Sequence, residues 1–206
     1  MIEKVFQKIY DNNKWQNEES RSGSGSTLKY TENLRNELPK IINQFEIKSI
    51  LDAPCGDFNW MKKILPKLNV DYIGGDIVPT LIKINSSNYS STNVKFIPLD
   101  ITKDKLPNTD LMICRDCLFH LSYEYINNFF KNFAKSNIKY LLTSTHINNG
   151  FKNRNIKVGA FRPIDLFLEP FNLPNSVLYR FDDWIEPSIP REMVLFDIDT
   201  IRKSVL

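Results

Sequence analysis

The segment Ser49–Phe58 (SILDAPCGDF) constrains the fold of this chain more than any other part of it. It begins as an apolar strand, ends in the acidic residue Asp52, and continues through a tight turn into the start of a helix. A strand–turn–helix of this kind leaves backbone N–H groups unpaired at the carboxyl edge of a sheet, where ligands of open α/β folds bind. We therefore expect an α/β fold with a ligand site after this strand.

Two further apolar segments also end in acidic residues. Val70–Pro79 reads as a strand that ends at Asp76, and the strand Val94–Leu99 is followed by Asp100. A carboxylate at the end of the second parallel strand, about 20 residues after the first turn, can accept both hydroxyls of a ribose. Any one of these acids could instead cap a helix. Because three acidic residues stand at three strand ends, a shared ligand site is favoured over three separate helix caps.

Asp52, Pro54 and Gly56 resemble the first motif of the class I S-adenosylmethionine-dependent methyltransferases, in which an apolar strand runs into Asp-x-Gly/Pro-x-Gly. Phe58 stands where this family usually has its last glycine. Pro54 and Phe58 also depart from the G-x-G-x-x-G fingerprint of dinucleotide-binding enzymes. The resemblance is sharpest from residue 50 to 121 and covers most of the chain from residue 34 onward.

The resemblance implies S-adenosylmethionine as the cofactor, bound at the carboxyl ends of the strands. Asp76 would hold the adenosine ribose, Asp100 or its neighbour would contact the adenine amino group, and Ile101 would pack on the adenine ring. The residues of the strand ends and the following turns that we assign to the cofactor are Asp52, Pro54, Gly56, Asp57, Asp76, Ile77, Asp100, Ile101 and Arg115.

The stretch Glu18–Ser26 (EESRSGSGS) is rich in glycine and serine. Such a stretch is most often a flexible linker. In the resembled family, however, the segment before the first helix often folds over the cofactor as a lid. As part of a lid, Arg21 would meet the methionine carboxylate or an anionic substrate, and Trp15 would stack over the cofactor site. Both interpretations remain open at this point.

The segment Arg115–Leu121, after the expected fourth strand, carries the candidate catalytic base. His120 is one of only two histidines, and its ordinary pKa of about 6.5 suits proton removal near neutral pH. If the segment is helical, Asp116 lies one turn before His120 and could orient its ring. His146, after the expected fifth strand, is the second candidate. Alternatively, His120 merely packs against the sheet.

Two residues beyond the fifth strand are candidates for binding the methyl acceptor, because the loop there usually shapes the acceptor pocket in the resembled family. These residues are Asn148 and Arg162. Arg162 could clamp an anionic acceptor, or it could form a structural ion pair with Asp165 or Glu169. The sequence favours neither role.

Alternating strands and helices predict a Rossmann-like methyltransferase fold, with a seven-stranded, mostly parallel sheet, helices on both faces and a terminal antiparallel hairpin. We expect one domain over residues 1–206, with residues 1–30 as a lid or linker and residues 31–206 as the catalytic core. The expected strands cover residues 49–51, 70–76, 94–99, 110–114, 139–145, 176–181 and 193–198. The expected helices cover residues 30–45, 59–68, 80–84 and 123–134, the first with Thr31 as its N-cap.

Charge and cysteine content narrow the classes of function. The net charge is +3 and the charges are interspersed, so the sequence contains no basic stripe of the kind that binds nucleic acids, and we expect no nucleic-acid partner. The sequence has no apolar run long enough to cross a membrane and no signal-peptide pattern. We therefore expect a cytoplasmic protein without a membrane partner. Three cysteines argue against a secreted disulfide scaffold, and the pair Cys114 and Cys117 lacks a second pair for zinc, so we expect no metal.

These features together predict an O-methyltransferase that acts on a hydroxyl or phosphate-type oxygen of a small molecule or surface-glycan precursor. Residues 51–60 and the Ser-Gly-Ser-Gly-Ser loop resemble compact bacterial methyltransferases of surface-polysaccharide (capsule) biosynthesis. One alternative is a non-catalytic cofactor-binding subunit that partners an active enzyme. Another is a nicotinamide-dependent oxidoreductase, for which the glycine fingerprint and a Tyr-x-x-x-Lys dyad are not evident. The sequence leaves the acceptor and the oligomeric state open.

Overall fold

The computed structural model describes residues 2–148 and 150–205, and the chain divides into two compact units, residues 1–100 and residues 101–206. Its seven strands have the order β3-β2-β1-β4-β5-β7-β6. The strands of the first unit are parallel, and the last strand pairs of the second unit are antiparallel. The predicted fold class, a mostly parallel seven-stranded sheet with a terminal hairpin, is therefore confirmed.

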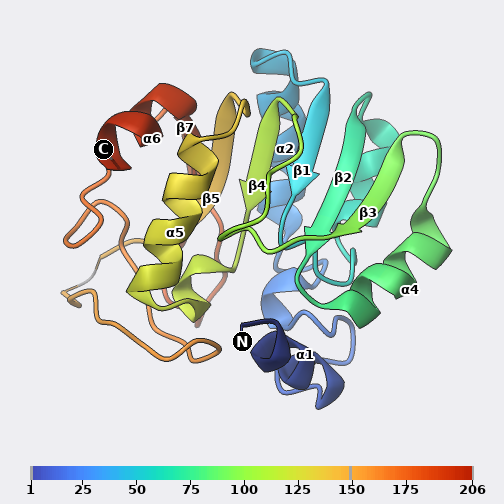
Figure 1. Cartoon of the computed structure of the whole chain (residues 1–206), viewed down its shortest axis with the longest axis horizontal. Helices are drawn as coiled ribbons and strands as arrows, with labels where there is room; N and C mark the ends of the chain where they lie inside the picture. The colour runs from blue at the N-terminus through green and yellow to red at the C-terminus, as the bar shows by residue number, and fades with distance from the viewer. Residues whose placement is uncertain (1, 149, 206) are drawn as a thin grey trace. The chain divides into compact units, whose positions relative to one another are not determined.

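In the first unit, β1, β2 and β3 lie side by side as parallel neighbours (Figure 1). Asp52 at the end of β1 pairs in register with Gly74 of β2, so β2 extends two residues further and ends at Asp76. The elements of this unit are α1 (Ile2–Asp11), η1 (Ser24–Ser26), α2 (Glu32–Gln44), β1 (Ser49–Asp52), α3 (Met61–Ile64), η2 (Leu65–Lys67), β2 (Asp71–Asp76), α4 (Pro79–Tyr89) and β3 (Val94–Pro98).

Helix α2 shows how the sequence specifies these elements. Its apolar residues recur three or four positions apart, and the four on that face are all buried: Leu34, Leu38, Ile41 and Ile42. Thr31 occupies the N-cap position, as predicted, but its hydroxyl donates to the Thr27 carbonyl over 2.8 Å and does not cap the helix. Burial of the apolar face, and not side-chain capping, therefore holds this helix in place.

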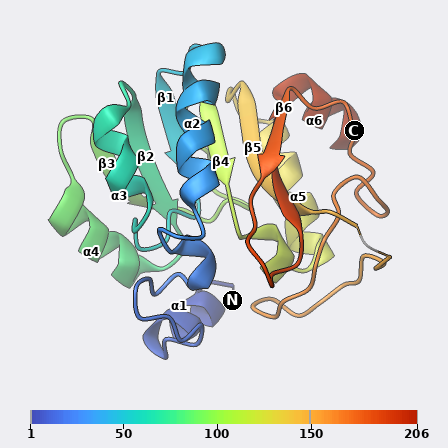
Figure 2. The same ribbon diagram turned by 180° about the vertical axis from the view of Figure 1, so that it is seen from behind.

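In the second unit, β4 and β5 are parallel, and β7 returns antiparallel between β5 and β6 (Figure 2). All four residues of β4 are buried, as expected for a strand covered on both faces. The elements of this unit are β4 (Leu111–Cys114), η3 (Leu118–His120), α5 (Tyr123–Ala134), β5 (Tyr140–His146), β6 (Tyr179–Asp182), β7 (Arg191–Asp197) and α6 (Ile198–Val205).

The helices differ from the expectations in four places. Two helices, α1 and α6, were not predicted. The helix expected over residues 59–68 is split into α3 and the 3₁₀ turn η2, because Pro66 has no N–H to continue the α-helical hydrogen-bond ladder. Helix α4 runs to Tyr89, five residues beyond the expected end. Among the helices of the described residues, none is both long and apolar enough to cross a membrane.

Candidate functional site

Gly56, in the turn after β1, is required both by its conformation and by the space around it. Its φ of 56° lies in the left-handed region, which glycine adopts without strain. A Cβ atom at this position would collide with the Ser22 hydroxyl. The Gly56 N–H donates to Asp76 Oδ2 over 3.1 Å, so the turn is tied to the end of β2. The two sequence motifs at these strand ends therefore meet in the first unit.

Phe58 departs from the family pattern but keeps a left-handed backbone, with a φ of 60°. Its ring is only 4% exposed and packs against three other rings. The centroid separations are 5.3 Å to Tyr72, 5.2 Å to Tyr89 and 5.1 Å to Phe96. The side chain that replaces the usual glycine is therefore part of the aromatic core of this unit, and its packing must offset the strain of the backbone.

Asp76 is a buried carboxyl group next to this turn, and its pKa is raised. It is buried at the end of β2, where Oδ1 accepts the Val78 N–H over 3.0 Å and Oδ2 accepts the Gly56 N–H. Burial raises the pKa of Asp76 to about 6, and the backbone N–H donors oppose this shift. Because each carboxylate oxygen can accept more than one hydrogen bond, Asp76 can hold a ligand hydroxyl while it keeps the turn in place.

The other predicted acids near this turn have well-defined positions. Asp52 is buried and accepts the Tyr72 hydroxyl over 2.8 Å. Asp100 is buried just after β3, and Ile77 follows Asp76 directly. Asp57 lies in the turn itself and accepts hydrogen bonds from the N-terminal segment, as described next. These positions agree with a ligand site at the strand ends, but the cofactor contacts of these residues remain predictions.

The Gly/Ser-rich stretch is tied to the turn after β1. Asp57 Oδ1 accepts the Ser20 hydroxyl over 3.0 Å, and Asp57 Oδ2 accepts the Arg21 N–H over 2.8 Å. The Asp57 N–H in return donates to Ser22 Oγ over 2.9 Å. Asn59 Nδ2 also donates to Glu19 Oε1 over 2.7 Å. This stretch therefore packs on the turn, as a lid would, and does not extend away from it as a free linker.

Arg21 and Trp15 both have contacts within the N-terminal segment. The Arg21 guanidinium donates to the carbonyls of Tyr10 and Asp11 over 2.8 and 3.3 Å, and it lies over the Tyr10 ring. It thus satisfies the last carbonyls of α1, where a cation is favourable. Trp15 is 36% exposed and packs close to Gly23 of the loop. Their contacts with a cofactor remain predictions.

In the second unit, a buried network of two arginines and two aspartates follows β4 and joins β7. Arg115 makes a bidentate pair with Asp183, with Nε–Oδ2 at 2.9 Å and Nη2–Oδ1 at 3.0 Å. Arg191 contacts Asp183 Oδ2 at 2.9 Å and Asp116 Oδ1 at 2.7 Å. Formal charges balance within this network. Arg115 thus has a structural role in this network, and its predicted contact with the cofactor remains a prediction.

The expected helical relation between Asp116 and His120 is wrong. Asp116 has a φ of 53°, and the 3₁₀ turn η3 begins only at Leu118, so no continuous helix places the two residues one turn apart. The Asp116 carboxylate pairs with Arg191 and, at 3.4 Å, with Arg115. Its charge still raises the pKa of His120, but as a lesser influence than the burial that lowers it.

The two histidines have different hydrogen-bond partners. His120 Nδ1 lies 2.9 Å from the Ala160 carbonyl oxygen, which can only accept a hydrogen bond. His146 Nδ1 lies 3.2 Å from the Ile164 backbone N–H, which can only donate. Burial lowers the pKa of both rings, to about 4 in the case of His146. Both histidines are therefore neutral at pH 7, with opposite tautomers.

Both histidine rings belong to one aromatic cluster, here called the ring cluster, which consists of Phe119, His120, His146 and Phe161. The Phe119 centroid lies 4.7 Å from His120, 5.2 Å from His146 and 5.5 Å from Phe161. The Phe161 centroid lies 6.0 Å from His120 and 6.1 Å from His146. Phe161 is half exposed, so the cluster reaches the surface of this unit. The sequence did not identify either phenylalanine as a site residue.

Arg162 is fully buried and serves as a clamp for the backbone. Its Nη1 donates to the Leu118 carbonyl over 3.0 Å and its Nε to the Arg154 carbonyl over 3.3 Å. Neither of the ion pairs considered from the sequence, with Asp165 or Glu169, forms among the described residues. Burial lowers the pKa of Arg162 to about 10, so the guanidinium still carries its charge at pH 7. The remaining nitrogen, Nη2, has no hydrogen-bond partner in the described part of the chain.

Asn148 closes the loop that follows β5. Its Nδ2 donates to the Phe151 carbonyl over 2.8 Å, and its Oδ1 accepts the Gly150 N–H over 2.7 Å. These contacts satisfy both ends of the amide within the loop. The predicted role of Asn148 in acceptor binding therefore has no further support from its contacts and remains a prediction.

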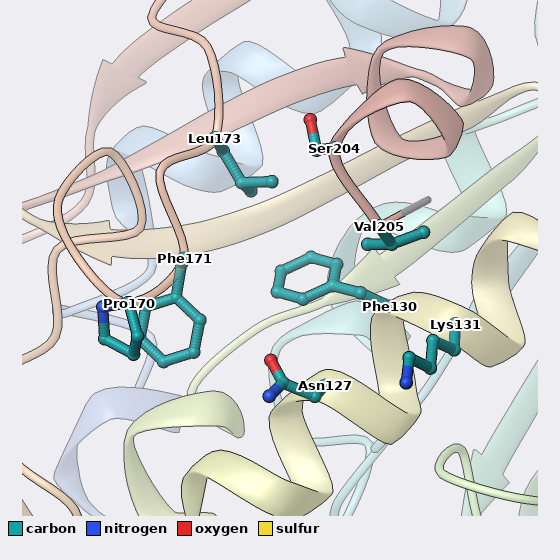
Figure 3. A pocket seen from close by; sticks show the side chains of 8 residues that line it. All are labelled: Asn127, Phe130, Lys131, Pro170, Phe171, Leu173, Ser204 and Val205. Carbon is teal, nitrogen blue, oxygen red and sulfur yellow. The ribbon is translucent and has the colours of Figure 1, made fainter.

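A shallow cavity of about 230 Å³ lies elsewhere in the second unit, between α5, α6 and the loop before β6 (Figure 3). Its wall is partly apolar, and Lys131 is the only charged residue among the described residues that line it. None of the predicted site residues lines it. The lining residues are Asn127, Phe130, Lys131, Pro170, Phe171, Leu173, Ser204 and Val205.

No family model and no curated protein matches the sequence, but solved structures share its fold. A SAM-dependent methyltransferase from Leishmania major aligns with a TM-score of 0.68 at 13% identity, over 92% of this chain and 82% of that chain. Magnesium protoporphyrin IX methyltransferase from Synechocystis PCC 6803, with bound SAH, aligns with a TM-score of 0.61 at 11% identity, over 84% of this chain and 85% of that one.

The structure of the N-methyltransferase NodS from Bradyrhizobium japonicum WM9 also shares the fold of this chain. It aligns with a TM-score of 0.61 at 12% identity, over 82% of this chain and 96% of its own. These three structures show that the chain has the Rossmann-like fold of class I methyltransferases, as the sequence predicted. At such low identities the likeness shows the fold alone.

Proposed function

We propose that this chain is an S-adenosylmethionine-dependent methyltransferase that transfers a methyl group to an oxygen of a small molecule or surface-glycan precursor. The observation that carries the proposal is the hydrogen bond between the Gly56 N–H and Asp76 Oδ2 in a chain with the methyltransferase fold. It joins the turn after β1 to the acidic end of β2, the two places where the resembled family holds its cofactor.

The residues of the first unit fit the cofactor chemically. Asp76 keeps acceptor capacity on both oxygens for the two ribose hydroxyls. Asp52, Asp57 and Asp100 surround the strand ends, and the loop tied to Asp57 provides a cover over the turn. When bound, S-adenosylmethionine would supply a methyl group already activated by its sulfonium. The chain's own residues then have to position the acceptor and remove its proton, and positioning provides most of the rate.

The choice of oxygen as the methyl acceptor rests on His120. An alcohol must lose its proton during transfer, and a neutral histidine can accept it, for a gain of about 10²–10⁴-fold in rate. A neutral amine attacks through its own lone pair and needs no base before attack. The choice of a glycan precursor rests on the sequence resemblance of residues 51–60 and the Ser-Gly-Ser-Gly-Ser loop to capsule enzymes.

Thermal unfolding with S-adenosylmethionine, S-adenosylhomocysteine and NAD side by side tests this function. A ligand at about 100 times its Kd adds roughly 2.7 kcal/mol to the stability of the folded state. For a chain of this size, each kcal/mol moves the Tm by about 2–4 °C. We expect a rise of about 5–11 °C with the two adenosyl ligands and none with NAD.

Two matched variants sharpen the test. Asp76→Asn should greatly reduce the rise, because the amide nitrogen is a donor and only one oxygen remains to accept both the backbone N–H groups and the ribose hydroxyls. Asp71→Asn makes the same chemical change at the exposed start of the same strand and should leave the rise intact. A rise with NAD alone, or no rise with either adenosyl ligand in the folded wild-type chain, would contradict the proposal. Binding without methylation of any acceptor would instead favour the cofactor-binding partner subunit.

A further inference from the structure

The cavity between α5, α6 and the loop before β6 is lined by none of the predicted site residues and has no role in the function proposed above. We propose that this cavity, of about 230 Å³, binds a small carboxylic acid whose carboxylate is attached to a single ring. The carboxylate binds to Lys131 and Asn127, and the ring packs on Phe130 and Phe171 (Figure 3). All four residues belong to the second unit, so this site requires neither the first unit nor the cofactor.

Lys131 supplies the positive charge of the site. Its ammonium makes no ion pair or hydrogen bond within residues 2–148 and 150–205. The residues three and four positions away in the sequence, where a helical ion-pair partner would stand, are Asn127, Asn128, Ala134 and Lys135. None of them is acidic, and no acid occurs among the described residues of the cavity wall. The charge of Lys131 is therefore available to an anion that enters the cavity.

Asn127 supplies the second hydrogen-bond donor. It precedes Lys131 by four positions in α5, so the two side chains share one face of the helix. Figure 3 shows the Asn127 side chain extending from α5 toward Phe171 of the facing loop. Its amide has no hydrogen-bond partner in the described part of the chain, whereas Ser204 already donates to the Thr200 carbonyl over 2.8 Å. The ammonium and the amide N–H groups are thus two free donors, which suit the two oxygens of a carboxylate.

The apolar part of the wall consists of side chains that the fold holds in place. Phe130, Phe171 and Leu173 are all buried. The Phe130 ring packs against Phe129, with centroids 5.2 Å apart. The Phe171 ring stands at 87° to the Tyr123 ring, with centroids 5.3 Å apart. These contacts fix the two rings of the wall, so they present a preformed apolar surface on which another ring can pack.

The volume and the single charge define the class of ligand. An apolar cavity of about 150 Å³ holds one benzene ring, so 230 Å³ leaves room for one ring and a small head group. One ammonium balances one negative charge, which favours a carboxylate over a phosphate monoester with its charge of about −1.5 to −2. An amine of the same size would be repelled by Lys131, and an alcohol would gain no ionic attraction.

Titration of the whole chain, followed by NMR of its backbone and side-chain amide groups, tests this site. The probes are benzoate, benzyl alcohol, benzylamine and phenyl phosphate, which carry the same ring and different head groups. For a ligand of this size we expect benzoate to bind with a Kd of about 0.1–10 mM and to shift the signals of Asn127, Phe171 and Ser204 together. Benzyl alcohol should bind about 5–20-fold more weakly, and benzylamine more weakly still.

Two matched pairs of variants locate the anion within the cavity. Lys131→Met keeps the length of the side chain and removes its charge, so benzoate should bind about 5–20-fold more weakly while benzyl alcohol is unaffected. Lys135→Met makes the same change outside the cavity and should have little effect. Asn127→Asp places a negative charge in the cavity at nearly the same volume and should abolish benzoate binding. Asn128→Asp, at the next residue, does not line the cavity and should have a much smaller effect.

Several results would overturn the inference. They are an absence of benzoate binding to the folded wild-type chain, shifts confined to residues outside the cavity, tighter binding of phenyl phosphate than of benzoate, and equal losses within either matched pair. Acetate separates the contribution of the charge from that of the ring, and acetate binding as tightly as benzoate would also contradict the proposed ligand class. None of these measurements requires S-adenosylmethionine or turnover, so their outcome is independent of the proposed methyltransferase function.

Discussion

Phe58 provides the sharpest test of the turn after β1, through a comparison of Phe58→Ala with Phe58→Gly. Both variants remove a ring that is 4% exposed and packs against three aromatic rings, which costs about 3–5 kcal/mol. They differ in backbone strain. At a φ of 60°, a residue with a Cβ atom pays about 1–2 kcal/mol that glycine avoids. Glycine in turn loses about 0.5–1 kcal/mol through its greater freedom in the unfolded chain.

We therefore expect Phe58→Gly to be about 0.5–1 kcal/mol more stable than Phe58→Ala, measured as the free energy of unfolding in urea. The matched control is the same pair of substitutions at Phe96, a buried neighbour in the regular strand β3. There the order should be reversed, because glycine weakens a strand. A Phe58→Gly chain that is less stable than Phe58→Ala would refute the left-handed conformation of residue 58 and with it our account of the turn.

Two further predictions concern the buried ionisable groups. Asp183→Asn should cost about 3–5 kcal/mol and lower the Tm, because it leaves two buried arginines to share the single carboxylate of Asp116; Asp182→Asn, at the neighbouring exposed residue, should change the Tm little. Acidification from pH 7 to 4 should have opposite effects through two groups. Asp76, whose pKa burial raises to about 6, stabilises the folded state by up to about 3 kcal/mol on protonation. His146, whose pKa burial lowers to about 4, destabilises it by a similar amount over the same window. In urea titrations at each pH, Asp76→Asn should therefore lose more stability than the wild type on acidification and His146→Gln less, and parallel curves for all three chains would contradict these shifts.

The sequence was most informative where burial and periodicity coincide. Four elements could be located because each is a continuous apolar or periodic stretch that ends in turn or polar residues. They are the strands that lead into Asp52, Asp76 and Cys114 and the helix Tyr123–Ala134. Helix α1 carries a similar signal, with apolar residues at positions 2, 5, 6 and 9, but the segment had been taken as a lid or linker. Helix α6 begins at Ile198 without a break after β7, and only Asp197, which accepts the Thr200 N–H over 2.7 Å, marks its start.

The roles of individual site residues were harder to predict, because their partners are far away in the sequence. Arg191 lies opposite His146 in the β5–β7 register, and this pairing brings it to Asp116, 75 positions earlier in the chain. No local pattern reveals that register. Arg21 is a similar case, since its choice of the α1 carbonyls depends on where a helix not predicted from the sequence ends. The sequence could therefore indicate a site from the type of a residue and its position at a strand end. It could not identify the hydrogen-bond partner that defines the role of each residue.

Long-range pairing also explains why His120 and His146, the first and second candidates for the base, have different hydrogen-bond partners. Each ring is placed by its own end of the segment Ala160–Ile164, which offers a carbonyl to His120 and an N–H to His146. Arg162, in the middle of that segment, binds the Leu118 carbonyl at the start of η3, and the Phe119 carbonyl accepts the Arg162 N–H over 3.3 Å. One short stretch of backbone, held by one buried arginine, therefore sets opposite tautomers on two histidines. A substitution at Arg162 should consequently disturb both rings together, while a substitution at either histidine should leave the tautomer of the other unchanged.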